Sequence, residues 1–203
     1  MKKPGLWKPE RRQEMPYRKE VFNSGAYYHL FNRGVNKEPI FFERENYLFF
    51  LRQIRKYFTY ELMTIIAYCL MPNHYHLLVD LKTNELGAVV QRFALSYSKA
   101  INKRFDRVGS LFQGPFKAIQ VDNNEYLLHL SRYIHFNPVD AGLVSKPEAW
   151  EFSSYRDFIE LRKGTLIDPE IVLSQFASPQ DYRKFVQDYQ EENIEFIRHL
   201  IIE

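Results

Sequence analysis

The sequence is poor in cysteine and has no long apolar run. Cys69 is the only cysteine among 203 residues, so neither an internal disulfide framework nor a cysteine-based zinc cluster can form. No apolar stretch reaches the roughly 18 to 20 residues that a membrane-spanning helix needs. The basic residues after Met1 are not followed by an apolar segment, so no secretory signal is visible. We therefore expect a cytoplasmic protein without a membrane partner.

The composition that is present is that of a folded protein with many aromatic side chains. The hydrophobic share of 45% and the charged share of 26% argue against a wholly disordered chain. A length of 203 residues suits one domain, or one domain with a tail. Aromatic residues make up 16% of the chain, and those not needed in the core would suit stacking on unpaired bases.

The net charge of +3 conceals an uneven distribution along the chain. Residues 1–20 carry seven Lys or Arg and three Glu, whereas residues 165–203 carry three basic and eight acidic side chains. Between them, residues 81–120 carry seven basic and two acidic side chains. The basic middle favours a polyanionic partner, although a solvated helix face explains the charges equally well.

Hydrophobic periodicity predicts four strands and four longer helices. The alternating, β-rich segments are 26–33, 61–70, 74–80 and 116–121, and the helical segments are 43–58, 84–105, 122–137 and 181–202. Asn84 is expected to cap one helix, and Asp122 with Glu125 resembles a capping box. The pair Asn137-Pro138 is expected to end the third helix.

This order predicts an α+β fold. The pattern strand, helix, strand, strand, helix, strand is that of a ferredoxin-like βαββαβ antiparallel sheet with helices on it. One further helix and a C-terminal helical extension follow it. For the extension, packing against the domain is favoured over a dimer contact or a lid.

Two histidines one residue apart are the sharpest local feature. Side chains alternate along a strand, so His74 and His76 point to the same side and Tyr75 to the other. Each imidazole could bind a divalent cation through one ring nitrogen and leave the other for a supporting partner. Two unrelated, half-buried histidines would produce the same pattern.

A tyrosine and an asparagine are neighbours on the predicted third helix. Tyr133 and Asn137 are four residues apart and so lie on one face. A phenol can act as a nucleophile in covalent catalysis. With 14 tyrosines in the chain, these residues alone favour a core tyrosine followed by a helix-ending Asn-Pro.

Taken together, several segments resemble a known family. They are 28–34 (YHLFNRG), 67–78 (AYCLMPNHYHLL), 109–114 (GSLFQG), 133–144 (YIHFNPVDAGLV) and 150–155 (WEFSSY). In this order they resemble the HUH single-strand endonucleases and, more closely, the REP-associated tyrosine transposases. The resemblance covers about residues 24–158 and suggests an HUH-type catalytic domain over 25–160. Outside it, the composition predicts a basic N-terminal arm over residues 1–24 and an acidic helical C-terminal extension over 161–203.

The resemblance also implies a mechanism. His74 and His76 would bind Mg²⁺ or Mn²⁺, with Asn137 as the third ligand. Tyr133 would attack a phosphate of single-stranded DNA that carries a palindromic hairpin, leaving a 5′-phosphotyrosine and a free 3′-hydroxyl. Imidazole ligands favour Mn²⁺ at least as much as Mg²⁺. Relatives act as monomers or as homodimers, so the oligomeric state stays open.

Candidate DNA contacts are basic side chains, and other functions stay possible at this point. The predicted phosphate contacts are Arg33, Arg92, Lys99, Lys103, Arg104 and Lys117. Phe112 and Phe116 could stack on bases or belong to the core, and His29, His129 and His135 have no assigned role. Two alternatives to a tyrosine transposase are a hairpin-binding protein without catalytic activity and a metal-dependent hydrolase that activates water.

Overall fold

The order of elements follows the predicted βαββαβ pattern. The computed structural model describes residues 21–188. The strands are β1 (Tyr27–Arg33), β2 (Met63–Met71), β3 (His74–Leu81) and β4 (Lys117–Val121), and the longer helices are α1 (Arg44–Tyr57), α2 (Leu86–Arg104) and α3 (Asn124–Asp140). After α3 come α4 (Tyr155–Phe158), α5 (Glu170–Leu173) and α6 (Pro179–Gln187), and short 3-10 helices cover Val35–Lys37 and Pro147–Ala149.

The four strands form one antiparallel sheet in the order β2-β3-β1-β4. Strands β2 and β3 form an antiparallel hairpin, with Met71 paired to His74 across the turn. Strand β1 lies between β3 and β4, so that Arg33 faces His74 and Phe31 faces both His76 and Lys117. The register therefore brings the first predicted strand directly beside the histidine pair.

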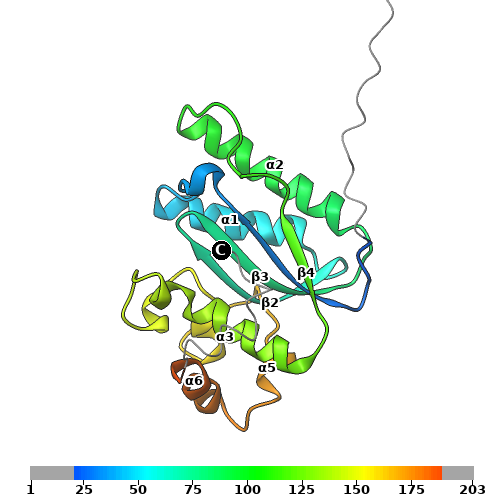
Figure 1. The fold of residues 1–203 in the computed structure, drawn as a ribbon, viewed down its shortest axis with the longest axis vertical. Coiled ribbons are helices and arrows are strands. Elements are labelled where there is room, and N and C mark those ends of the chain that lie inside the picture. The colour runs from blue at the N-terminus through cyan, green and yellow to red at the C-terminus, as the bar shows by residue number, and fades with distance from the viewer. Residues whose placement is uncertain (1–20, 189–203) are drawn as a thin grey trace, which may run out of the picture.

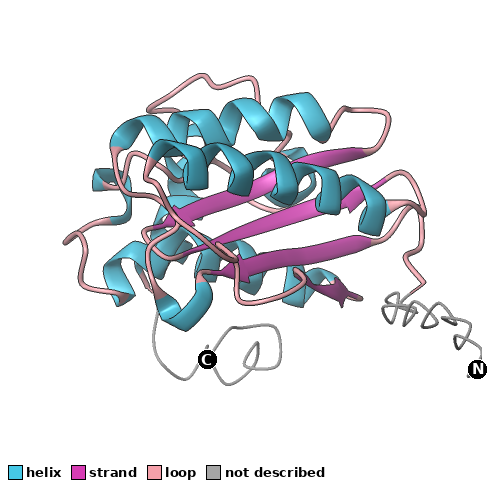
Figure 2. Cartoon of the chain, turned by 90° about the horizontal axis from the view of Figure 1, so that it is seen from above, coloured by secondary structure: helices cyan, strands magenta, loops and turns pink. Residues whose placement is uncertain are grey.

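Helices cover both faces of the sheet (Figure 1). Helices α1 and α2 pack together on one face, and Figure 2 looks down on this layer. Helix α3 packs on the other face, against β2 and β3. The alternation of β3 divides its side chains accordingly, since Tyr75 and Leu77 join the core under α1 and α2 while Leu78 joins the core under α3. His74 and His76 share the parity of Leu78, so they face α3.

A close approach of backbone explains the glycine at the end of β1. Gly34 donates its backbone N–H to the Asn73 carbonyl at 2.8 Å. A Cβ at this position would lie 2.0 Å from the Glu38 carbonyl oxygen. Only glycine therefore lets the chain turn here while it stays in contact with the residue that precedes His74.

The predicted helix boundaries need three corrections. Asn84 does not cap α2, because its Oδ1 accepts the Ser24 backbone N–H at 2.9 Å and the N-cap residue is Glu85. Asp122 does not cap α3 either, since Asn123 holds that position and accepts the Tyr126 N–H at 2.9 Å. The third helix does not end at Asn137-Pro138 but runs to Asp140 with Pro138 inside it.

The described part of the acidic extension packs against α3. Helix α6 contacts α3, and the buried Tyr182 hydroxyl lies 2.6 Å from His135 Nδ1 and 3.1 Å from Ser131 Oγ. The favoured packing role is thus observed for residues 179–187. The remainder of the helix predicted over 181–202, like residues 1–20 of the predicted arm, lies outside the described residues. Between residues 21 and 188, no helix has the length and apolarity to cross a membrane.

Candidate active site

The histidine pair stands at the start of β3, on the face covered by α3. The ring centroids of His74 and His76 lie 4.9 Å apart at 86°. His76 is fully buried and His74 is partly exposed. The two imidazoles lie on one face of the strand and are thus close enough to bind the same metal ion.

The Nδ1 atom of His74 is held by the preceding residue. His74 Nδ1 lies 2.6 Å from Asn73 Oδ1, and Asn73 Nδ2 donates to the Lys37 carbonyl at 3.0 Å. A carbonyl only accepts, so the amide nitrogen must point at Lys37 and the amide oxygen at the ring. His74 therefore carries its proton on Nδ1 and has a lone pair on Nε2.

His76 is held through the same ring atom by a residue of β1. Its Nδ1 lies 2.9 Å from His29 Nε2, and both side chains are fully buried. The other nitrogen, Nε2, is buried and has no hydrogen-bond partner among the described residues. A buried polar atom without a partner is costly, and in a native protein it calls for an explanation such as a bound ion.

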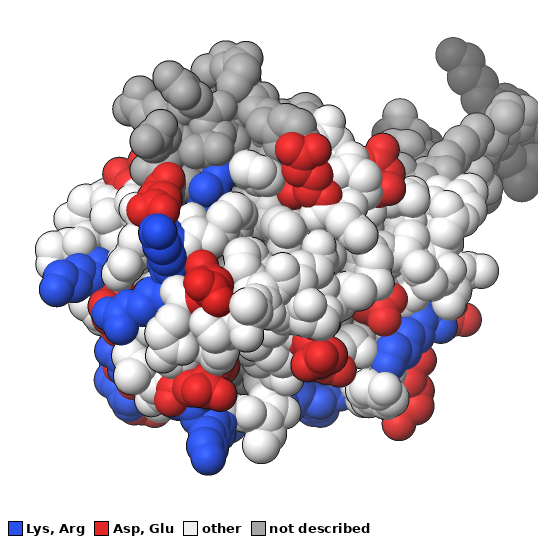
Figure 3. Space-filling model, turned by 90° about the horizontal axis from the view of Figure 1, so that it is seen from below, with Lys and Arg blue, Asp and Glu red and all other residues white. Residues whose placement is uncertain are grey.

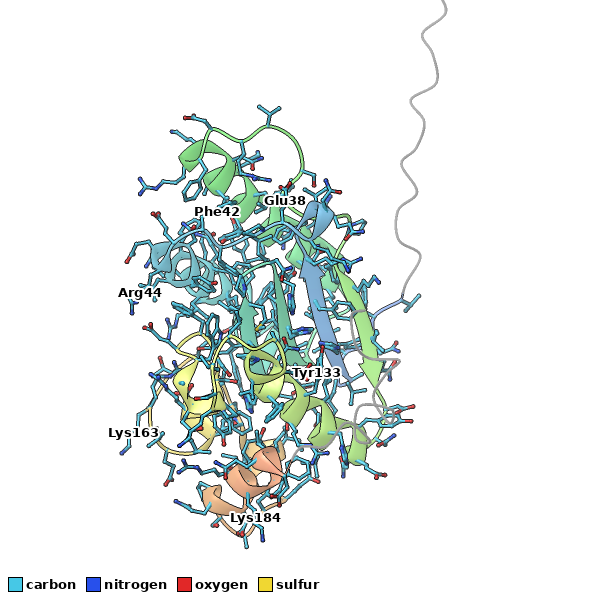
Figure 4. The ribbon with its side chains drawn as sticks, turned by 60° about the vertical axis from the view of Figure 1, so that its left-hand side comes forward. Glu38, Phe42, Arg44, Tyr133, Lys163 and Lys184 are labelled. Carbon is cyan, nitrogen blue, oxygen red and sulfur yellow. The ribbon has the colours of Figure 1, made fainter. Side chains whose placement is uncertain are left out.

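Helix α3 brings Tyr133 and Asn137 to the histidines. The Tyr133 ring meets the His76 ring edge to face, with centroids 5.4 Å apart, and Figure 4 labels it where α3 faces the sheet. The Asn137 side chain is a hydrogen-bonding partner of His74. Both α3 side chains are buried, at 6% and 7% exposure. Because the helix continues through Pro138, Asn137 stays in the last turn and points to the same side as Tyr133.

Burial keeps both imidazoles neutral. It lowers the pKa of His74 to about 4. The hydrogen bond with Asn137 raises this pKa and the charge of Arg33 lowers it further, but burial has the largest effect. It also lowers the pKa of His76 well below its ordinary value, and His74 and His29 add to the effect. A neutral imidazole with a free lone pair is the form that binds metals.

The donor set fits a divalent cation. It consists of two Nε2 atoms with their Nδ1 atoms already held, plus the amide oxygen of Asn137. Within the described chain, no three His, Cys, Asp or Glu side chains gather in a way that could hold a metal. A metal site at His74 and His76 would therefore depend on the Asn137 amide as its third ligand. Imidazole and oxygen ligands together suit ions such as Mn²⁺.

Two of the predicted DNA contacts lie on the face of the sheet that carries the histidines. Arg33 pairs with His74 across the strands, and its Nε donates to Gln113 Oε1 at 2.5 Å. Lys117 pairs with Phe31, and its Nζ lies 5.8 Å from the centre of that ring. Lys117 is exposed and sits on the edge strand β4.

The other four predicted contacts lie in a different layer. Arg92, Lys99, Lys103 and Arg104 belong to α2, on the face of the sheet opposite to the histidines. All four are exposed, and Arg104 Nε pairs with Glu43 at 3.2 Å. On the side of the molecule that carries α3, α5 and α6, acidic and basic side chains are intermixed (Figure 3). The structure thus does not join the α2 cations and the histidine pair into one patch.

Several other aromatic and histidine side chains turn out to be structural. Phe112 and Phe116 are 5% and 7% exposed and belong to the core under α1 and α2, so stacking on bases does not describe them. His135 points away from the site, with Nδ1 at the Tyr182 hydroxyl and Nε2 2.7 Å from Ser154 Oγ.

Two supporting residues were not identified from the sequence. Asn73 is only one residue of the segment 67–78 in the sequence analysis, and His29 has no assigned role there. The run Pro-Asn-His could have indicated the first, because an Asn beside a strand histidine is within reach of its ring. Nothing local indicates the second, since 47 residues separate His29 from His76 and only the strand pairing joins them.

Comparison with known proteins agrees with this architecture. Residues 22–137 match the family described as "Transposase IS200 like". Among solved structures, a REP-associated tyrosine transposase bound to a REP hairpin is 18% identical with a TM-score of 0.60, and the match covers 76% of this chain and 94% of the other. A tRNA(His) guanylyltransferase from Saccharomyces cerevisiae is 14% identical with a TM-score of 0.43, covering 90% and 81%, a likeness too weak to carry an argument. No curated protein sequence matches the chain.

Proposed function

The chain belongs to the family of IS200-like transposases, which are enzymes, and on this premise we propose that it is a metal-dependent, single-strand DNA endonuclease and strand transferase acting through Tyr133. The observation that carries the proposal is the meeting of Tyr133 on α3 with His76 on β3, at a centroid distance of 5.4 Å. Beside them lie His74 and Asn137. The four side chains supply a nucleophile and a neutral set of metal ligands in one place.

In the proposed reaction the Tyr133 hydroxyl oxygen attacks a backbone phosphate. A bond forms between that oxygen and phosphorus, and the bond from phosphorus to the 3′ oxygen breaks. The phenol loses one proton, and the leaving 3′ oxygen gains one proton to become a hydroxyl. The 5′ end of the DNA is then linked to the enzyme, so a second 3′-hydroxyl can reverse the step. Burial of Tyr133 between α3 and the sheet restricts the ring, and this positioning lowers the barrier to attack.

His74, His76 and Asn137 are the residues that would hold the cation. A bound Mg²⁺ or Mn²⁺ would withdraw negative charge from the phosphate under attack. Because these ligands carry no negative charge, the full charge of the cation is available to the phosphate. We expect Mn²⁺ to support cleavage at least as well as Mg²⁺.

We further propose that the DNA partner is a single strand with a palindromic hairpin. The structural relative at 18% identity is bound to a REP hairpin, which supports this choice of substrate. Arg33 and Lys117 are the cations placed to contact the phosphates next to the cleaved one, given their strand pairing with His74 and Phe31. Arg92, Lys99, Lys103 and Arg104 would contact a more distant stretch of the same DNA.

We also infer that the sheet is of the ferredoxin-like type. This is supported by the strand order β2-β3-β1-β4, in which β3 lies between the two strands that α1 connects.

The test is covalent capture of an oligonucleotide that carries a hairpin from the DNA flanking the gene. In Mn²⁺, wild type is expected to give a protein–DNA adduct that survives denaturing electrophoresis. Tyr133→Phe removes only the hydroxyl oxygen and should abolish the adduct. Tyr126→Phe is the matched control, because Tyr126 lies on the same helix two turns earlier and has no proposed role.

Other outcomes separate the alternatives. An adduct with Tyr133→Phe would assign the nucleophile to another residue. Cleavage by wild type without an adduct would identify a hydrolase that activates water. Tight hairpin binding with neither cleavage nor adduct, in Mg²⁺ and in Mn²⁺, would identify a binding protein without catalytic activity.

A further inference from the structure

We propose that His29 is a positioning residue that fixes the tautomer of His76 and thereby presents the His76 Nε2 lone pair to the metal. The inference rests on the proposed function, because it assigns a role toward the metal that His74, His76 and Asn137 would hold. It assigns this role to a histidine on a different strand, β1.

The geometry around His29 makes the contact specific. His29 Nε2 lies 2.9 Å from His76 Nδ1, and the two rings stack with centroids 5.1 Å apart at 19°. Both side chains are fully buried. Phe31 lies against both rings, with centroids at 4.6 Å from His29 and 6.1 Å from His76, and it restricts their rotation. Water is thus kept from replacing the contact.

A single proton is shared between the two nitrogens, so two arrangements are possible. If His29 donates, His76 must carry its own proton on Nε2, where the atom is buried and has no partner in the described chain. If His76 donates from Nδ1, its Nε2 bears a lone pair instead. A buried N–H without an acceptor is among the rarest features of native proteins, so the second arrangement is favoured.

The neighbouring ligand shows the same design. The Asn73 amide oxygen can only accept, so it fixes the proton of His74 on Nδ1 and the lone pair on Nε2. His29 does for His76 what Asn73 does for His74. Both Nε2 atoms, which are the ring nitrogens farther from the backbone, then bear a lone pair on the side of the sheet that faces α3. A partner behind a metal-binding imidazole typically raises metal affinity 10- to 100-fold.

The experiment has two readouts on the full chain. The first is ¹⁵N NMR of histidine-labelled protein in EDTA, because protonated and bare ring nitrogens resonate apart. The second is the Kd for Mn²⁺ from titration calorimetry without DNA. The variants are His29→Phe, which keeps a ring but has no acceptor, and His29→Gln, which restores one. Phe31→Leu is the control, because it loosens the packing of both rings and leaves the hydrogen bond.

We expect wild-type His76 to be protonated on Nδ1 and bare on Nε2. In His29→Phe the proton should move to Nε2 in a measurable fraction of molecules, and the Kd for Mn²⁺ should rise about 10- to 100-fold. His29→Gln should recover most of the affinity, and Phe31→Leu should retain the wild-type tautomer. A purely structural role for His29 would change stability without moving the tautomer.

Opposite results overturn the proposal. Wild-type His76 protonated on Nε2 refutes it even if His29→Phe does not fold. So does wild-type affinity for Mn²⁺ in a folded His29→Phe. If wild type has the expected tautomer but binds no Mn²⁺, the metal site of the proposed function fails and the effect of His29 on the tautomer stands.

Discussion

Replacing the buried His135 by glutamine should make the free energy of unfolding depend less steeply on pH below about 6.5. His135 is fully buried on α3, and its two ring nitrogens contact the Tyr182 hydroxyl and Ser154 Oγ. Burial lowers its pKa from an ordinary 6.5 to about 3, and the charge of Arg162 adds to the effect. The native protein therefore keeps this imidazole neutral while the unfolded chain takes up a proton.

The size of the effect follows from proton linkage. Between pH 6.5 and pH 3 the unfolded state binds about one more proton than the native state at this residue, so stability falls as the pH falls. The slope is roughly 1.4 kcal/mol per pH unit, which gives about 5 kcal/mol in total if the window is fully crossed. Above pH 6.5 the residue contributes no pH dependence.

The assay is urea unfolding followed by circular dichroism in EDTA at pH 7.5, 6.5, 5.5 and 4.5. His135→Gln retains a donor and an acceptor but does not titrate, so the variant should lose stability less steeply than wild type below pH 6.5. At pH 7.5 the variant should be less stable than wild type. His129→Gln is the control, because His129 is only half-buried on the same helix. Parallel pH profiles for wild type and His135→Gln would refute the argument.

Three further predictions concern the supports of the site and the DNA contacts. Asn73→Ala should weaken Mn²⁺ binding about 10- to 100-fold, since His74 loses the acceptor at 2.6 Å. Asn84→Ala is the control and should not change the affinity. Calorimetry measures both variants, and equal affinities would count against the assigned tautomer of His74. Gly34→Ala should lower the free energy of unfolding by about 1 to 3 kcal/mol, because its Cβ would lie 2.0 Å from a carbonyl oxygen. Urea titrations measure this, and Gly114→Ala is the control because the space around Gly114 is open. Equal midpoints for the two variants would show that the backbone at Gly34 adjusts. Lys117→Gln should reduce the slope of log K against log salt for single-stranded DNA by about 0.7. Lys163 lies away from Tyr133 in Figure 4, so Lys163→Gln should leave this slope unchanged. The opposite pattern would show that the DNA binds along a different part of the surface.

Local patterns predicted the strands because those signals are short in range. The alternation over 74–80 placed His74 and His76 on one face, and the aromatic run over 26–33 gave β1 nearly to the residue. Helix ends were less predictable. Pro138 does not stop α3, because the residues after it still find carbonyl partners, with Ala141 N–H on Asn137 and Leu143 N–H on Pro138.

The site itself could be predicted only in part, for a different reason. The spacing of Tyr133 and Asn137 placed both on one helix face, but which sheet residue that face meets depends on how α3 crosses β3. That crossing is a tertiary contact, as is the pairing that brings His29 to His76. The same holds for the basic residues, whose division between the α2 layer and the histidine face follows from the sheet lying between them.

The central claim is that Tyr133 forms a covalent bond to DNA, and mass spectrometry of the captured adduct tests it most directly. After digestion with nuclease and trypsin, the peptide from Tyr133 to Arg156 should carry the nucleotide remnant, since Arg132 precedes it and Pro147 protects Lys146. Fragmentation should place the added mass on Tyr133 and not on Tyr155, which is fully buried. Added mass on any other residue, or cleavage of the hairpin substrate with no modified peptide, would contradict the account.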